Sequence, residues 1–136
     1  MSNIATRHPN QLLRVVEGRM PFMGFETYYR IVGDKSDKAP LLLIHGGPGS
    51  THNYFEVLDD LALTTGRQVI SYDQLGCGES YVEGRPELWT LQTWEDELDA
   101  LRRHLHLDRV HLLGQSWGGM LIIAYLIDRK PEGVES

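Results

Sequence analysis

Three short apolar segments, each followed at once by a glycine-rich loop, place the strongest constraint on the fold of this chain. The segments are 41–44, 68–72 and 110–113, and the loops that follow them are 45–49, 73–78 and 114–118. Runs this short and this apolar are typical of strands buried on both faces of a sheet. Because helical patterns separate them, we expect parallel strands, whose carboxyl ends share one edge of the sheet. The three loops should therefore meet at that edge.

The clearest helical pattern covers residues 90–107. Its apolar residues recur every three or four positions, which places them on one side of a helix. They are Leu91, Trp94, Leu98, Leu101 and Leu105. Thr90 or Thr93 can cap the first turn of this helix. Asp99 and Arg103 are four residues apart and can form an ion pair on its exposed side.

Two further helices and an N-terminal strand pair complete the expected order of elements. We expect one helix over 53–62, and residues 120–127, apolar on nearly all sides, predict a helix in the middle of a domain. Residues 12–16 and 25–32 have strand patterns, and the turn-forming segment 18–24 between them predicts an antiparallel pair at a sheet edge. The expected fold class is α/β, a mostly parallel sheet with helices on both faces.

Length and composition suit one ordinary globular domain. With 136 residues, 41% of them hydrophobic and 24% charged, the chain can bury a core. The net charge of -6 and the scattered basic residues argue against a nucleic-acid partner, and no apolar run is long enough to cross a membrane. Residues 1–11 lack the apolar stretch of a secretory signal, and the lone Cys77 cannot form an internal disulfide, so we expect a cytoplasmic location.

Residues 114–118 read Gly-Gln-Ser-Trp-Gly and match the pattern Gly-x-Ser-x-Gly. A sharp turn with this pattern exposes the serine hydroxyl, and its glycines avoid collisions with the strand before and the helix after. The positive end of that helix favours a developing oxyanion. Five residues can match by chance, but the strand before them and the helix after them favour Ser116 as the catalytic nucleophile.

Residues 45–49 read His-Gly-Gly-Pro-Gly and follow the strand whose loop supplies the second oxyanion donor in sites of this kind. We expect the backbone N–H groups of Gly47 and Trp117 to form the oxyanion hole. Pro48 should stiffen the loop. His45 is expected to hold the shape of this loop through local hydrogen bonds rather than to act as the base.

Other residues that could carry chemistry fit a structural role better. Cys77 has no base nearby in the sequence pattern and is interpreted as a loop thiol. Three histidines show no metal-ligand spacing, so neither a metal nor a cofactor is expected. They are His104, His106 and His111. Asp128 is the only aspartate after Ser116, but it lies about three helical turns further along the same helix and should point away from the serine.

Taken in order, these motifs resemble the signatures of the proline iminopeptidases, serine aminopeptidases of the α/β-hydrolase fold. The matching segments are 45–49, 73–80 and 114–119, and the resemblance covers essentially the whole chain. Two features favour this family over generic esterases: Trp117 after the serine, and Asp73-Gln74 in the middle loop, which is the second of the three glycine-rich loops, residues 73–78. The resemblance implies an α/β-hydrolase core, Ser116 as the nucleophile, and small peptides with N-terminal proline as substrates.

The sequence departs from the family pattern in two respects. Leu75 stands where the family commonly has arginine, which leaves the preferred peptide length open. The family's acid, histidine and helical cap come after the serine, and no histidine follows Ser116 here. We therefore expect residues 1–136 to be the N-terminal part of a single hydrolase domain, inactive on its own. An esterase or lactonase of the same fold and a non-catalytic fragment remain alternatives.

Overall fold

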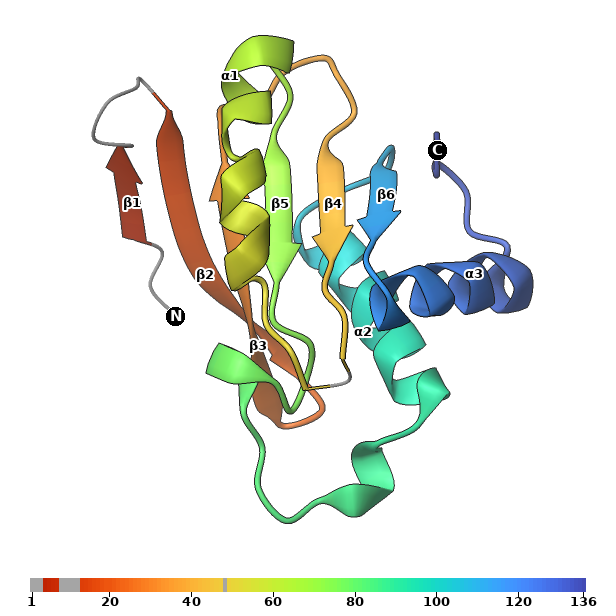
Figure 1. Cartoon of the computed structure of the whole chain (residues 1–136). Helices are drawn as coiled ribbons and strands as arrows, with labels where there is room; N and C mark the ends of the chain where they lie inside the picture. The colour runs from red at the N-terminus through yellow and green to blue at the C-terminus, as the bar shows by residue number, and fades with distance from the viewer. Residues whose placement is uncertain (1–3, 8–12, 48) are drawn as a thin grey trace.

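The computed structural model describes residues 4–7, 13–47 and 49–136, which form a six-stranded sheet with helices on both faces (Figure 1). Along the sheet the strand order is β1-β2-β3-β5-β4-β6. The strands are β1 Ile4–Arg7, β2 Arg14–Phe22, β3 Phe25–Val32, β4 Leu41–Ile44, β5 Val69–Tyr72 and β6 His111–Gly114. Leu12, in an expected strand, and Pro48, in an expected loop, lie outside the described residues.

The C-terminal half of the sheet is parallel, as the sequence predicts. β4 lies between β5 and β6 and pairs in parallel with both, with Leu42 opposite Ile70 on one side and Leu112 on the other. Leu42 and Ile70 are fully buried, as expected for strands covered on both faces. The carboxyl ends of the three strands lie at the lower edge of the sheet in Figure 1, where their glycine-rich loops follow.

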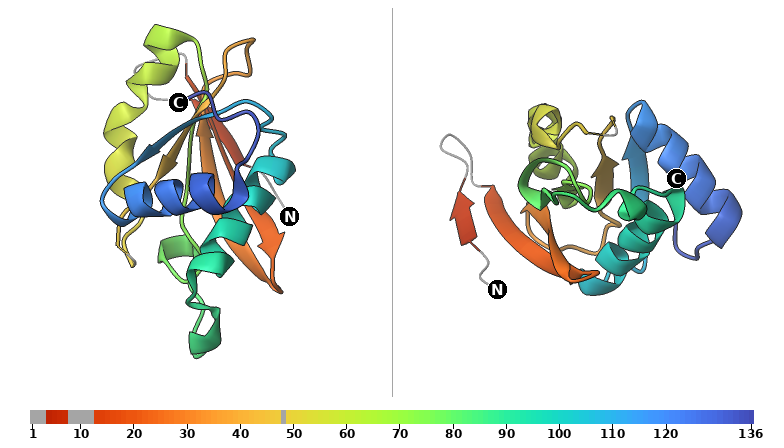
Figure 2. Two further views of the ribbon diagram at one scale, coloured as in Figure 1. Left: turned by 90° about the vertical axis from the view of Figure 1, so that its right-hand side faces the viewer. Right: turned by 90° about the horizontal axis from the view of Figure 1, so that it is seen from below.

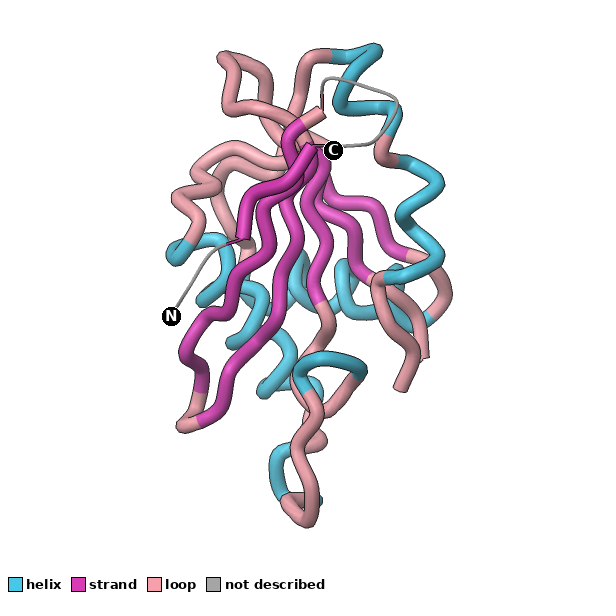
Figure 3. Tube along the Cα trace, turned by 90° about the vertical axis from the view of Figure 1, so that its left-hand side faces the viewer, coloured by secondary structure: helices cyan, strands magenta, loops and turns pink. Residues whose placement is uncertain are grey.

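The N-terminal half is antiparallel, and its turn is shorter than predicted. Residues 18–22, expected in the connection, continue β2 and pair with β3 as far as Phe22 opposite Phe25. The turn needs only Met23 and Gly24, whose φ angles of 51° and 81° are those of a two-residue hairpin. The resulting long hairpin extends beyond the neighbouring strands (Figure 3).

The strand β1 pairs with the outer side of β2, so the antiparallel pair β2–β3, which the sequence predicts at the edge of the sheet, has one more strand beyond it. β1 covers only Arg14–Glu17 of β2. Pro21 lies further along β2, opposite Glu26 of β3, where no described strand pairs with the other side of β2. A strand that is paired on one side only is the setting in which a sheet tolerates proline.

The described residues form six helical segments. They are η1 Asn53–Leu58, α1 Asp60–Thr65, η2 Gly78–Ser80, η3 Pro86–Leu88, α2 Leu91–His104 and α3 Trp117–Arg129. The helix expected over 53–62 is divided into η1 and α1, and α1 continues to Thr65, where Gly66 with a φ of 71° ends it. η1 and α1 lie on one face, and α2 and α3 lie on the opposite face (Figure 2).

Each face of the sheet packs its own hydrophobic core. On the η1 and α1 side, Phe55 and Ala62 pack with Val69 of β5. On the other side, Leu98 of α2 and Leu121 of α3 belong to a larger cluster with residues of β4 and β5. Because alternate side chains of a strand point to opposite faces, the short apolar strands contribute to both cores.

The first turn of α2 is capped by Thr90, whose side chain accepts a hydrogen bond from the N–H of Thr93 at 3.2 Å. The expected ion pair between Asp99 and Arg103 is not found within the described residues. Asp99 instead accepts hydrogen bonds from the Tyr125 hydroxyl at 2.6 Å and from Arg129 at 3.0 Å. An exposed pair on one helix gains only about 0.3 to 0.5 kcal/mol, so partners on the packed helix α3 are preferred.

The helix α3 is more exposed than its apolar sequence predicts. Leu121 and Tyr125 are fully buried, but three other apolar side chains are more than half exposed. They are Met120, Ile123 and Ile127, at 63%, 59% and 66%. After α3 the chain returns to the sheet, where Val134 forms a parallel bridge to Val110 just before β6. Within the ranges that the structure describes, no helix is long and apolar enough to cross a membrane.

Candidate active site

The Gly-x-Ser-x-Gly segment forms a sharp turn, the elbow, between β6 and α3. Ser116 has a φ of 55° and a ψ of -118°, which is strained for a residue other than glycine, and its side chain is exposed. The N–H of Gly119 donates to the Ser116 carbonyl at 2.9 Å, and the N–H of Gln115 donates to the Ile44 carbonyl at 3.2 Å. Trp117 is the first residue of α3, so its N–H has no partner inside the helix.

Two glycines of the elbow are required by close packing of backbone against backbone. A Cβ on Gly118 would lie 2.0 Å from the carbonyl oxygen of Ile44, and a Cβ on Gly114 would lie 2.4 Å from the carbonyl carbon of Gly118. No flexible side chain could move aside to relieve either contact. The next glycine, Gly119, would keep its Cβ 3.6 Å from the nearest atom, which is ordinary contact.

The loop after β4 lies against the elbow. A Cβ on Gly46 would lie 3.4 Å from the Cβ of Ser116. The N–H of Gly46 donates to the Tyr54 hydroxyl at 2.7 Å, and that hydroxyl donates to the side-chain oxygen of Gln115 at 3.0 Å. Gly47 has a φ of 124°, a conformation that favours glycine. Tyr54 of η1 therefore ties this loop to the elbow.

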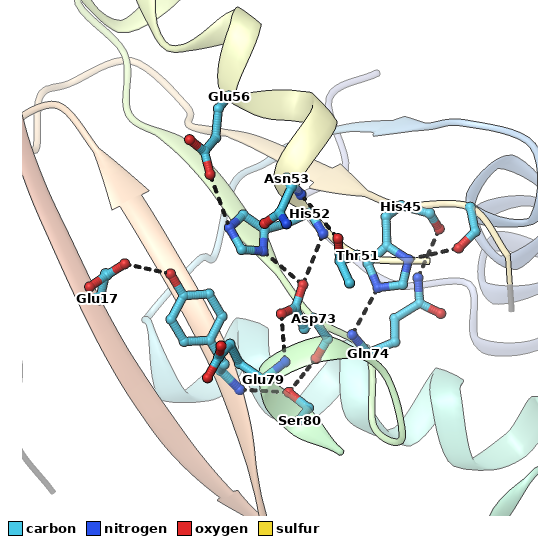
Figure 4. Close-up of polar contacts among 12 residues, drawn as sticks. Glu17, His45, Thr51, His52, Asn53, Glu56, Asp73, Gln74, Glu79 and Ser80 are labelled. Carbon is cyan, nitrogen blue, oxygen red and sulfur yellow. Dashed lines mark hydrogen bonds and ion pairs between the residues drawn. The ribbon is translucent and has the colours of Figure 1, made fainter. Parts of the chain in front are cut away.

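His45 is fully buried and holds the loop after β4 in contact with the loop after β5 (Figure 4). Its Nδ1 donates to the Gly46 carbonyl at 2.7 Å, and its Nε2 accepts from the N–H of Gln74 at 3.0 Å. An amide donor on Nε2 requires the neutral tautomer with the proton on Nδ1. Burial lowers the pKa of His45, which also favours the neutral ring. Both ring nitrogens are engaged, so His45 maintains the loop, as the sequence predicts.

Gln74 joins the loop after β4 to the elbow. It is fully buried, and its side-chain nitrogen donates to the His45 carbonyl at 2.9 Å. Its side-chain oxygen accepts a hydrogen bond from the indole N–H of Trp117 at 3.1 Å. Trp117 in turn packs edge-on against Trp94 of α2, with 5.6 Å between the ring centroids. Gln74, which belongs to the loop after β5, therefore contacts both the loop after β4 and the elbow.

Asp73, beside Gln74, organises the start of the middle loop (Figure 4). Its carboxylate accepts hydrogen bonds from the backbone N–H and ring Nδ1 of His52, at 2.9 and 2.7 Å, and from the N–H of Glu79 at 3.0 Å. Burial alone would raise the pKa of Asp73, but these hydrogen bonds outweigh it and hold the pKa below its ordinary value. A Cβ on Gly78 would lie 2.6 Å from the same carboxylate, so the loop closes tightly around Asp73.

Comparison with known proteins decides the family. A family model described as alpha/beta hydrolase fold matches residues 39–136, which contain all three loops of the site. This chain belongs to the α/β-hydrolase fold family.

Individual relatives of this chain have a more specific name than the fold family. The proline iminopeptidases of Lactobacillus helveticus (strain DPC 4571) and Clostridioides difficile (strain 630) are 64% and 63% identical to the chain over 125 residues. These matches cover 91% of the chain and 42% of each relative, so the chain spans about two fifths of their length. The crystal structure of the Mycobacterium smegmatis proline iminopeptidase has a TM-score of 0.79 and 40% identity, covering 87% of this chain and 41% of that one. The resemblance to proline iminopeptidases expected from the motifs is confirmed.

The other residues that the sequence analysis considered for chemistry lie in structural surroundings. Burial raises the pKa of the Cys77 thiol, which disfavours the reactive thiolate. Asp128 lies beside Glu95 of α2. Burial and the neighbouring carboxylate of Asp128 both raise the pKa of Glu95. The ring of His104 packs edge-on against Tyr29, and in the described part of the chain no cluster of side chains could hold a metal ion.

Two residues that shape the candidate site were not identified from the sequence. Tyr54 lies in a segment expected to be an ordinary helix, and nothing in the pattern marks its contact with the elbow. The position of Glu97 could have been noticed in the sequence, because Glu97 is a charged residue on the apolar side of α2. It follows Trp94 by three positions and precedes Leu101 by four. Glu97 is buried on that side, and it accepts a hydrogen bond from the N–H of Leu75 in the middle loop.

Proposed function

We propose that this chain is the nucleophile-bearing N-terminal part of a proline iminopeptidase, which releases N-terminal proline from small peptides. The proposal rests on one combination: a strained, exposed Ser116 at the end of β6, in a chain 64% identical to a curated proline iminopeptidase. The strain is informative because such conformations persist where the surrounding structure enforces them, often at active sites. Gly114 and Gly118 provide that enforcement through their backbone contacts.

In the proposed reaction, the Ser116 hydroxyl oxygen attacks the carbonyl carbon of the N-terminal prolyl residue. Its proton passes to a histidine outside these 136 residues, because none of the described histidines hydrogen-bonds the Ser116 hydroxyl and none follows it in the sequence. The peptide C–N bond then breaks, and the histidine returns the proton to the leaving amine. Water hydrolyses the resulting ester, releasing proline and free Ser116.

The oxyanion of each tetrahedral intermediate is assigned to the N–H groups of Gly47 and Trp117. Two contacts support this assignment. The N–H of Gly46 is already bound to Tyr54, which leaves the next amide of the loop for the substrate. The N–H of Trp117 is at the positive end of α3 and has no helical partner. Each such donor is typically worth about 10² to 10³ in rate.

A cytoplasmic location is part of the proposal. It is supported by Cys77, which is a free, buried thiol. Thiols remain reduced in the cytosol, whereas small secreted domains use their cysteines in disulfides.

The test compares the full-length wild-type protein with its Ser116→Ala variant on a proline arylamide and on a nitrophenyl ester. Ser116→Ala should lose nearly all turnover of the arylamide and keep the circular dichroism spectrum of the wild type, because the elbow depends on its glycines. Substantial residual turnover would place the nucleophile elsewhere. Wild-type turnover of the ester without turnover of the arylamide would favour an esterase.

A further inference from the structure

Glu97 of α2 is a fully buried carboxyl group that the proposed chemistry does not use. Its two oxygens accept the N–H of Leu75 at 3.0 and 2.9 Å, and the Thr27 hydroxyl donates to one of them at 2.6 Å. Within the described residues it has no ion pair with a basic side chain. Burying a carboxyl group costs free energy, whereas burying an apolar side chain of the same size is favourable. Packing alone therefore does not explain a glutamate at this position.

The contacts of Glu97 lead to the active site through two consecutive residues. The N–H of Leu75 belongs to the peptide group that joins it to Gln74, so Glu97 fixes the orientation of that peptide. The carbonyl of Leu75 accepts a hydrogen bond from the Trp94 indole at 3.3 Å, so α2 holds both sides of this residue. Gln74 then binds His45 in the loop after β4 and Trp117 in the elbow.

We propose that Glu97 is a positioning residue of the active site, which aligns the loop after β4 with the elbow through Leu75 and Gln74. This inference rests on the proposed function, because it assumes that these two elements together form the oxyanion hole. Glu97 touches neither the substrate nor Ser116. Its effect should therefore appear in the rate of acylation and not in the binding of the substrate.

The titratable groups that face Glu97 are Tyr72 of β5 and Cys77 of the middle loop. Burial raises the pKa of both, so both are neutral near pH 7. Burial also raises the pKa of Glu97 to about 7, against the opposing effect of its hydrogen bonds from Thr27 and Leu75. A protonated carboxyl can still accept the Leu75 N–H with one oxygen and donate to the Thr27 hydroxyl with the other. Glutamine can reproduce this arrangement, whereas the thioether of methionine is at most a weak acceptor for the Leu75 N–H and has no hydrogen to donate to Thr27.

The experiment measures the rate at which a fluorophosphonate labels Ser116, together with kcat and KM for a proline arylamide, in the full-length protein. Glu97→Met should slow labelling and lower kcat by at least about tenfold with KM within about threefold, because misaligned donors weaken the transition state. Glu97→Gln should retain both rates within about threefold. Leu101→Ala, one turn along α2, is the control for lost stability: it should lower the unfolding temperature while leaving the labelling rate close to that of the wild type.

Three outcomes distinguish a failure of the positioning role of Glu97 from a failure of the proposed function. Equal labelling rates in Glu97→Met and the wild type would overturn the positioning role while leaving the proposed function in place. A wild type that is not labelled at Ser116 would overturn the proposed function and the inference together. If Glu97→Met does not fold, Glu97→Asp retains the charge but draws the carboxyl back from Leu75, and an unchanged labelling rate in that variant would also overturn the positioning role.

Discussion

Replacing Gly118 by alanine tests the elbow most directly, because the structure predicts a collision with a definite atom. The added Cβ would lie 2.0 Å from the Ile44 carbonyl oxygen and 2.8 Å from that of His45. Both atoms belong to the backbone at the end of β4, so the strain cannot be relieved by a side-chain rotation. Either the end of β4 or the start of α3 must move by roughly an ångström or more.

A neighbouring glycine provides a matched control. Gly119 lies on the same turn of α3, but its Cβ would meet no atom closer than 3.6 Å. Overpacking a site without room typically costs about 1 to 3 kcal/mol, and we expect about 3 kcal/mol for Gly118→Ala because the obstacle is backbone. Gly119→Ala should instead stabilise the protein by up to about 1 kcal/mol, through the helix propensity of alanine.

Urea unfolding of the two variants and the wild type, followed by circular dichroism, measures both changes. The expected difference between the variants is up to about 4 kcal/mol, the sum of the two effects above. Fluorophosphonate labelling of the folded Gly118→Ala protein should also be much slower, because Ser116 moves with the start of α3. A Gly118→Ala variant as stable as Gly119→Ala would refute the reasoning that close backbone packing shapes the elbow.

Three further predictions concern Gly47 in the loop after β4, the buried carboxyl group of Glu97 and the apolar face of α3. Gly47→Val should lower kcat by at least about 10²-fold. It should also lower the unfolding temperature, because a Cβ at this position would lie 2.4 Å from the Gly49 nitrogen. An unchanged kcat would exclude Gly47 from the oxyanion hole. Since the pKa of Glu97 rises from 4.5 to about 7 on folding, the native state binds its proton more tightly, and stability should fall by about 3 kcal/mol as the pH rises through this interval. Urea unfolding at several pH values should show this slope in the wild type and its loss in Glu97→Gln, and equal slopes would contradict the burial argument. Residues 1–136 made alone should self-associate through the exposed apolar side chains of α3, and a compact monomer in size-exclusion chromatography would contradict this expectation.

Local patterns in the sequence were enough to predict the parallel strands and their loops. A buried strand, a glycine-rich turn and an apolar helix each leave a signature within about ten neighbouring residues. The proposed positions of the nucleophile, Ser116, and of an oxyanion donor, Gly47, follow from such signatures, because the proposed chemistry requires glycine around them. The same local patterns were less accurate at the β2–β3 turn, where two residues with positive φ suffice and Gly18 and Pro21 lie inside the strand.

The tertiary structure alone decided which distant side chains hold the loops together. Tyr54 and Gln115, Gln74 and Trp117, and Thr27 and Glu97 are 61, 43 and 70 residues apart in the sequence. Their hydrogen bonds depend on how the helices dock against the sheet, and no local periodicity encodes that geometry. Asp99 illustrates the same limit, because its partners on α3 replace the local Arg103. The sequence by itself determined where the proposed nucleophile and oxyanion donors stand along the chain, and the packing of α2 and η1 against the sheet decided which side chains hold their loops together.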